Sequence, residues 1–126
     1  MRSVDTNVLV RLIARDDPKQ TAAAEKFISR GAWVSHLVLA ETMWVLESVY
    51  ERMPDQIGMV VEMMLAHQNL VVQDPEIVAG ALESFRMRPS VGFSDALILE
   101  MARKAGHVPL GTFDRNLSKM DGAELA

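Results

Sequence analysis

The chain has 126 residues, of which 49% are hydrophobic and 24% are charged, as is typical of one soluble globular domain. It contains no cysteine, which excludes disulfides, thiolate metal sites and a cysteine nucleophile. No apolar run reaches the roughly 18 residues of a membrane span and no secretory signal is recognisable, so we expect a cytoplasmic protein. The formal net charge of −4 argues at first against a nucleic-acid partner. If a metal neutralised four carboxylates, however, the remaining charge would be about zero.

The first part of the chain alternates short strand-like segments with helical ones. Residues 2–5 are expected to form a strand, and residues 8–14 a helix. Asp17 followed by Pro18 is a typical helix start, and Gly31 ends that helix. The pattern then predicts a strand at 32–34, a helix at 37–50 capped by Ser35, a helix from Pro54 and a strand at 70–72.

The second part repeats this alternation. Asp74-Pro75 begins a helix whose apolar residues recur at helical spacing, and a loop over 87–92 follows. Ser94 or Asp95 begins a helix that runs to Ala105, a fourth strand occupies 108–110, and the tail is short. Alternating strands and helices indicate a parallel sheet covered on both faces. We therefore expect a single three-layer α/β/α domain over residues 1–126, with a short parallel sheet of four to five strands.

Four acidic residues stand out because each lies in apolar sequence near a strand end or a helix start. A carboxylate among core residues is costly unless it is paired, hydrogen-bonded or bound to a metal. Ligands of a parallel sheet bind at the carboxyl ends of its strands, where two of these acids would lie. Together the four would form a hard-cation site suited to phosphodiester chemistry. They are Asp5, Glu41, Asp95 and Asp114.

Two of the acids lie within predicted helices. Glu41 is flanked by Leu37 and Val38 on one side and by Trp44 and Val45 on the other, so its carboxylate is expected to point into packing and not into water. Asp95 is expected to share a helix face with the apolar positions, with Glu100 and Lys104 on the solvent side. The apolar positions of that face are Ile98, Leu99 and Ala102.

Each acid also has a purely structural interpretation. Asp5 could cap a helix from Val8 onward, and Asp114 or Thr112 could cap a last short helix. Asp95 could complement a helix dipole, an effect of roughly 0.3–1 kcal/mol. Glu41 could pair with a buried arginine. Because this account needs a separate explanation for each acid, we favour a shared metal site.

The ordered set of these motifs resembles a PIN domain, and more narrowly the VapC-type toxins of bacterial toxin–antitoxin pairs. The residues that carry the resemblance are Asp5-Thr6-Asn7-Val8-Leu9-Val10, Glu41, Phe93-Ser94-Asp95-Ala96-Leu97-Ile98 and Thr112-Phe113-Asp114. The resemblance implies that the four acids bind the metal, with Asn7 and Thr112 supporting them. It also implies a homodimer and a cognate antitoxin protein. Gly92 and Asn116 stand where many relatives have further acids, which makes a second metal position less secure.

The chemistry expected of such a site is metal-dependent hydrolysis of RNA. Mg²⁺ or Mn²⁺ prefers oxygen ligands and lowers the pKa of a bound water, which attacks the phosphodiester in line while a carboxylate accepts its proton. In the family this leaves a 5′-phosphate and a 3′-hydroxyl. Asp5 is expected to be a direct ligand. Because clustered acids repel one another, at least one pKa should be raised when metal is absent.

Other residues have weaker assignments. Arg115 is the best candidate for holding the RNA backbone, with Arg11, Arg15, Arg86 and Arg88 as others, although each could simply be solvated. Ser94 could position a metal-bound water, but capping its helix is the favoured interpretation. His36, His67 and His107 receive no role. Met59 and Met63 form an extra row beside Ala66 that suits either packing or an adaptable binding surface.

Other functions remain open at this stage. A non-catalytic PIN-fold binding module would keep the scaffold without the reaction, and a DNA nuclease would use the same metal site. A phosphoaspartate phosphatase is disfavoured because that class needs a second aspartate where this chain has Asn7. The sequence does not identify the RNA target or the number of metals.

Overall fold

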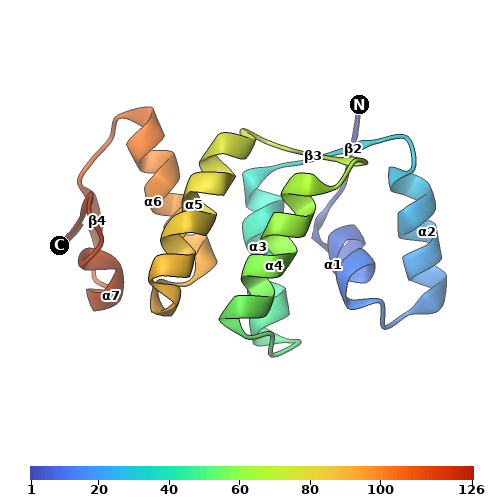
Figure 1. Cartoon of the computed structure of the whole chain (residues 1–126), viewed down its shortest axis with the longest axis horizontal. Helices are drawn as coiled ribbons and strands as arrows, with labels where there is room; N and C mark the ends of the chain where they lie inside the picture. The colour runs from blue at the N-terminus through green and yellow to red at the C-terminus, as the bar shows by residue number, and fades with distance from the viewer. The chain divides into compact units, whose positions relative to one another are not determined.

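The computed structural model describes all 126 residues, and the chain divides into two compact units, Met1–Pro75 and Glu76–Ala126 (Figure 1). Every strand pairing in both units is parallel, and helices connect the strands. The predicted α/β architecture is therefore confirmed, whereas one domain over residues 1–126 stays a prediction. None of the helices has the length and apolar character that a bilayer crossing requires.

Unit 1, residues Met1–Pro75, is built on a three-stranded parallel sheet. Its elements are β1 (Arg2–Ser3), α1 (Thr6–Ala14), α2 (Pro18–Ile28), β2 (Ala32–Val34), α3 (His36–Ser48), α4 (Pro54–Ala66) and β3 (Leu70–Val72). The strand order is β1-β2-β3, with Ala32 in register with Arg2 on one side and Leu70 on the other. In Figure 1, α1 lies between α2 and α3, and α4 lies beside α3.

Side-chain caps begin three of the helices of unit 1. Asp17 and Ser35 cap α2 and α3 as predicted, since each side chain accepts a hydrogen bond from the backbone N–H three residues later. Pro18 occupies the first position of α2, where its missing N–H costs nothing. α1 begins at Thr6, two residues earlier than predicted, because Asp5 caps it in the same way.

A polar clamp joins the end of β3 to the start of α3. The backbone N–H of His36 donates to Oε1 of Gln73 at 2.9 Å, and Nε2 of the same histidine donates to the Gln73 carbonyl at 2.7 Å. The N–H of Gln73 donates in turn to the Val34 carbonyl at 2.8 Å. His36 is buried, so its place in the fold is structural, in keeping with the absence of a catalytic assignment.

Unit 2, residues Glu76–Ala126, contains a two-stranded parallel sheet. Its elements are α5 (Pro75–Met87, which begins one residue before the unit), a 3-10 turn (Pro89–Val91), α6 (Phe93–Ala105), β4 (Leu110–Thr112), α7 (Arg115–Ser118) and β5 (Ala123–Leu125). Leu110 is in register with Ala123. Val91, Leu99 and Leu117 are buried together.

The last strands differ from their prediction. The fourth strand occupies 110–112 and not 108–110, because Pro109 has no N–H to donate to a neighbouring strand. Pairing begins at Leu110, whose N–H donates to the Gly122 carbonyl at 2.8 Å. The tail contains β5, so the chain has five strands, within the predicted range, in two separate sheets.

The start and the exposed face of α6 also correct the prediction. The helix begins at Phe93, after Gly92 with a φ of 88°, and no side chain caps it, so capping by Ser94 is wrong. Glu100 is half-buried over α5, since a Cβ placed on Gly80 would lie 2.9 Å from its Oε1. Its predicted place on the solvent side is therefore wrong. Ile98, predicted to face the core with Asp95, is exposed.

Candidate metal centre

Asp5 lies at the N-terminus of α1, two residues after the end of β1. Its Oδ1 accepts the backbone N–H of Val8 at 3.2 Å, which confirms the cap interpretation. Capping uses one carboxylate oxygen, and Oδ2 has no hydrogen bond within the chain. Because the side chain is exposed, Asp5 can cap its helix and still offer an oxygen to a ligand.

Thr6 links the first acid to the second. Its hydroxyl donates a hydrogen bond to Oε1 of Glu41, and its side chain is buried between them. Asp5 and Glu41, which are far apart in the sequence, are thereby joined through the residue next to Asp5. This role of Thr6 was not predicted from its place in the Asp5-Thr6-Asn7 motif. The only signal for that role was a hydroxyl beside Asp5, because its partner lies 35 residues away.

The environment of Glu41 corrects its predicted burial. Glu41 is exposed, and no arginine pairs with it. The buried side of α3 is formed by Leu39, Met43 and Leu46, and at 100° per residue Glu41 points away from that side. Its apolar neighbours are on the outer side too, since Leu37 and Trp44 are 77% and 61% exposed. The carboxylate therefore faces outward on a helix that is apolar all round.

A hollow of about 390 Å³ opens beside Asp5. Asn7 lines it, as do residues from α2. Asn7 is exposed, so its amide is available to a ligand in the same hollow. Its supporting role for the metal stays a prediction.

In unit 2, Asp114 caps α7 as one interpretation of the sequence predicted. Its Oδ1 accepts the N–H of Leu117 at 2.9 Å. The backbone N–H of Asp114 donates to Oγ1 of Thr112 at 3.0 Å, so the threonine fixes the backbone that carries the acid. Asp114 is exposed, and its second carboxylate oxygen remains open, as in Asp5.

Asp95 lies in the first turn of α6 and is half-buried. Burial raises the pKa of this carboxyl above its usual range, and the negative charge of Asp114 raises it further. The two acids of unit 2 therefore repel each other. A cation bound between them would relieve that repulsion, which is the behaviour expected of metal-binding carboxylates.

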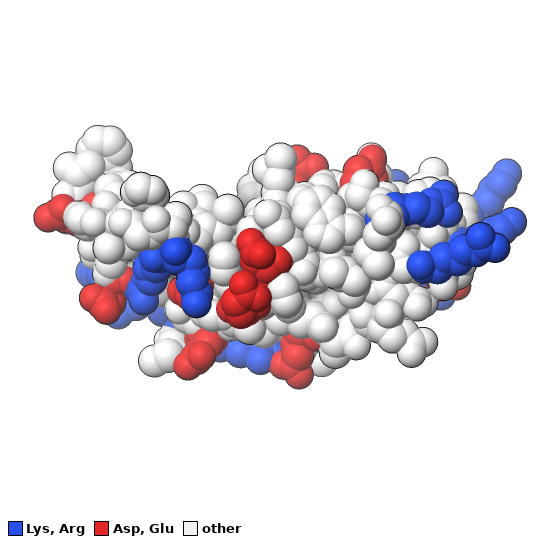
Figure 2. Space-filling model, turned by 90° about the horizontal axis from the view of Figure 1, so that it is seen from above, with Lys and Arg blue, Asp and Glu red and all other residues white.

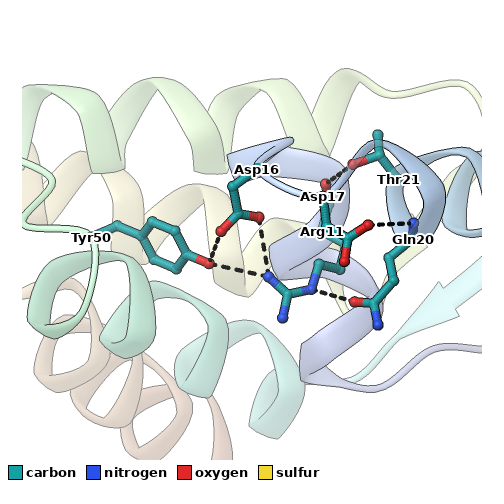
Figure 3. Close-up of polar contacts among 6 residues, drawn as sticks. All are labelled: Arg11, Asp16, Asp17, Gln20, Thr21 and Tyr50. Atoms are coloured by element: carbon teal, nitrogen blue, oxygen red, sulfur yellow. Dashed lines mark hydrogen bonds and ion pairs between the residues drawn. The ribbon is translucent and has the colours of Figure 1, made fainter.

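Arg11 and Arg15, two of the predicted RNA-binding residues, are held by partners in unit 1. Nη1 of Arg11 lies 3.0 Å from Oδ1 of Asp16, and its Nε donates to Oε1 of Gln20 at 2.6 Å (Figure 3). The Tyr50 hydroxyl donates to Asp16 at 2.8 Å, which lowers the pKa of that aspartate. Arg15 pairs with Glu25 at 2.6 Å. Neither guanidinium is simply solvated.

Arg115, the preferred candidate, differs from these two arginines. It is exposed at the first position of α7, next to Asp114, and forms no ion pair. Of the four acids, Asp5 and Glu41 belong to unit 1, and Asp95 and Asp114 belong to unit 2. Neither unit on its own assembles three His, Cys, Asp or Glu side chains into a metal-binding group.

Comparison with known families identifies the family of the chain. The PIN domain family model matches residues 3–123, which include Asp5, Glu41, Asp95 and Asp114. The chain belongs to the PIN domain family. No curated protein and no solved structure matched it. PIN domains are generally metal-dependent nucleases that bind nucleic acid and use divalent ions, so the chain has a nuclease-type fold.

The donor set of this PIN domain fits a hard divalent cation. Its four acids are carboxylates, which are the ligands that such ions prefer, and no thiolate is present to favour a softer metal. Asp5 and Asp114 each keep an open oxygen beside their cap, and Asp95 would lose an unfavourable repulsion. The chemistry of the residues and that of the family therefore agree.

Proposed function

We propose that this PIN domain is a metal-dependent endoribonuclease of the VapC type, the toxin of a toxin–antitoxin pair acting in the cytoplasm. The observation that carries the proposal is family membership over residues 3–123 with carboxylates at Asp5, Glu41, Asp95 and Asp114. These four serve one Mg²⁺ or Mn²⁺ centre. When bound, such an ion supplies an acidified water and neutralises charge on the phosphate oxygens.

The residues of the chain have distinct tasks in this proposal. Asp5 and Asp114 offer their open oxygens as ligands, each from a fixed helix N-terminus. Thr6 orients the Glu41 carboxylate by donating its hydroxyl proton to Oε1. Arg115 contacts a phosphate of the RNA next to Asp114. A carboxylate of the centre accepts the proton of the attacking water.

The protein partners follow from the same resemblance. A homodimer and a cognate antitoxin are expected of a VapC-type toxin. The exposed methionine row of α4, Met59 and Met63, is 66% and 42% exposed, so it is available as an adaptable apolar surface.

Cleavage of a labelled single-stranded RNA with and without Mg²⁺ or Mn²⁺ tests the activity. Asp5→Asn should reduce the rate by about 10²–10³-fold, because several kcal/mol of charge stabilisation are lost. Asparagine caps a helix as well as aspartate does, so α1 should remain folded. Asp17→Asn is the matched control, since it makes the same change at the cap of α2, and it should leave the rate unchanged.

The same assay separates the competing functions. Products with a 5′-phosphate and a 3′-hydroxyl are expected from attack by water. Absence of cleavage with both metals, or full activity of Asp5→Asn, would contradict the proposal and favour a scaffold module. Cleavage of a DNA strand of the same sequence in place of the RNA would identify a DNA nuclease.

A further inference from the structure

A basic hollow lies on unit 1. Its volume is about 410 Å³, and its lining residues are Arg2, Ala23, Lys26, Phe27, Ser29 and Arg30. They come from β1 and from the C-terminal half of α2 with the residues that follow it. Figure 2 shows Lys and Arg side chains gathered over the part of the view where Figure 1 draws α2.

The three cations of this hollow have no acidic partner. The ion pairs of the chain join Arg11 to Asp16 and Arg15 to Glu25, and none involves Arg2, Lys26 or Arg30. Three basic side chains thus line one hollow in a chain with 17 acidic and 13 basic residues. Lys26 lies in the last turn of α2, where a cation complements the helix dipole. That effect does not account for Arg2, which comes from β1.

Arg2 is held in place by an aromatic ring. Its guanidinium carbon lies 3.5 Å from the centre of the Phe27 ring, a stacked cation–π arrangement. Stacking fixes the guanidinium plane while its N–H groups remain free to donate. Such a preorganised guanidinium suits a phosphate, which it can bind through two hydrogen bonds at once.

The basic hollow shares two lining residues with the hollow beside Asp5. Ala23 and Phe27 line both, so the surface runs from the cations across the phenyl ring to Asp5. Along the chain the three extended residues from Arg2 to Asp5 span about 10 Å. Arg2 and Asp5 are therefore close enough for one RNA strand to contact both.

We propose that Arg2, Lys26 and Arg30 bind the phosphate backbone of the single-stranded RNA that extends from Asp5 across Phe27. This inference rests on the proposed nuclease function and adds the path of the substrate. The contacts are made to phosphates, so they add affinity without preference for a sequence. Arg11 and Arg15 do not belong to the path, because acidic partners hold them.

The salt dependence of RNA binding tests the path. Binding of a fluorescein-labelled oligouridylate is followed by anisotropy at increasing KCl in the Asp5→Asn background without added Mg²⁺ or Mn²⁺, where cleavage should be slow. Each lost phosphate contact reduces the magnitude of the negative slope of log K against log [salt] by about 0.7, so Lys26→Gln with Arg30→Gln should reduce it by about 1.4. Arg2→Gln alone should reduce it by about 0.7.

Lys19→Gln with Lys104→Gln is the matched control. It removes two exposed lysines at the start of α2 and the end of α6, and its slope should equal that of the background protein. Equal slopes in all the variants would overturn the proposed path. If the wild type cleaves RNA while the slopes are equal, the nuclease function stands and only the path fails. A wild type that neither binds nor cleaves RNA overturns both.

Discussion

The two pairs of acids are held in different ways. In unit 1 a hydroxyl donated by Thr6 binds Glu41, so a neutral donor of the chain itself orients one carboxylate. In unit 2 burial raises the pKa of Asp95, and the negative charge of Asp114 raises it further. Asp5 and Asp114 are nevertheless alike, since each caps a helix through Oδ1.

The fold positions the acids of unit 1, whereas charge repulsion acts between the acids of unit 2. The pair in unit 1 is oriented by the fold before any cation arrives, whereas the pair in unit 2 retains a repulsion that only a cation or a proton can remove. Substitutions in unit 1 should therefore act mainly on the orientation of a ligand. Substitutions in unit 2 that remove a charge should, besides weakening metal binding, raise the stability of the metal-free protein.

The largest expected contrast is in metal affinity, between a variant of Thr6 in unit 1 and a variant of Thr112 in unit 2. Thr6→Val removes the hydroxyl that touches Glu41, and the loss of such an outer partner should lower metal affinity by about 10–100-fold. Thr112→Val removes only the acceptor of the Asp114 N–H, an exposed hydrogen bond of about 0.5–1.5 kcal/mol, so its effect should be below about tenfold. The metal concentration for half-maximal cleavage measures both.

A serine control decides whether the Thr6 hydroxyl is responsible for the loss of metal affinity. Thr6→Ser keeps the donor and should restore most of the metal affinity that Thr6→Val loses. If the serine variant is as weak as the valine variant, the methyl packing of the buried threonine matters and not its hydrogen bond. Equal effects of Thr6→Val and Thr112→Val would remove the contrast between the two units.

Asp95→Asn should give a smaller effect, on stability. A carboxyl whose pKa is raised on folding stabilises the folded state when protonated, and this contribution is lost as the pH rises through the raised pKa. At neutral pH the charge of Asp95 should therefore lower the free energy of unfolding of the metal-free wild type. Asp95→Asn removes the charge and should raise the Tm modestly at neutral pH in the presence of EDTA.

The pH dependence identifies the cause of that stabilisation. In acid, below the usual aspartate pKa, Asp95 is protonated in both the folded and the unfolded state, so the two Tm values should converge. Glu83→Gln, at an exposed position of α5, is the control and should show no comparable gain. A gain that persists unchanged into acid would mean that packing, and not charge, is responsible.

The parts of the fold that could be predicted are those governed by neighbouring residues. Asp17-Pro18 and Ser35 begin their helices through bonds within one turn, and the stripe through Val78, Leu82 and Phe85 is buried as its spacing predicts. The strand β5 escaped prediction because Ala123–Leu125 is extended only through its pairing with β4. Nothing in three residues of local sequence marks such a pairing.

The site was predictable in its members and less so in their surroundings. The acids were identified by their type and order, but the exposure of Glu41 was not, because α3 is apolar on every side and periodicity cannot locate its core face. The bond from Thr6 joins residues 35 apart. The basic hollow combines Arg2 with Lys26 and Arg30, which no sequence motif connects.

The central claim is that the two pairs of acids serve a single metal centre. Titration of Mn²⁺ into the wild type, Asp5→Asn and Asp95→Asn by calorimetry tests it most directly. The account predicts uptake by the wild type and a severe loss of affinity in each variant, although one change is in unit 1 and the other in unit 2. Uptake that is absent from the wild type, or unaffected by either change, would contradict it.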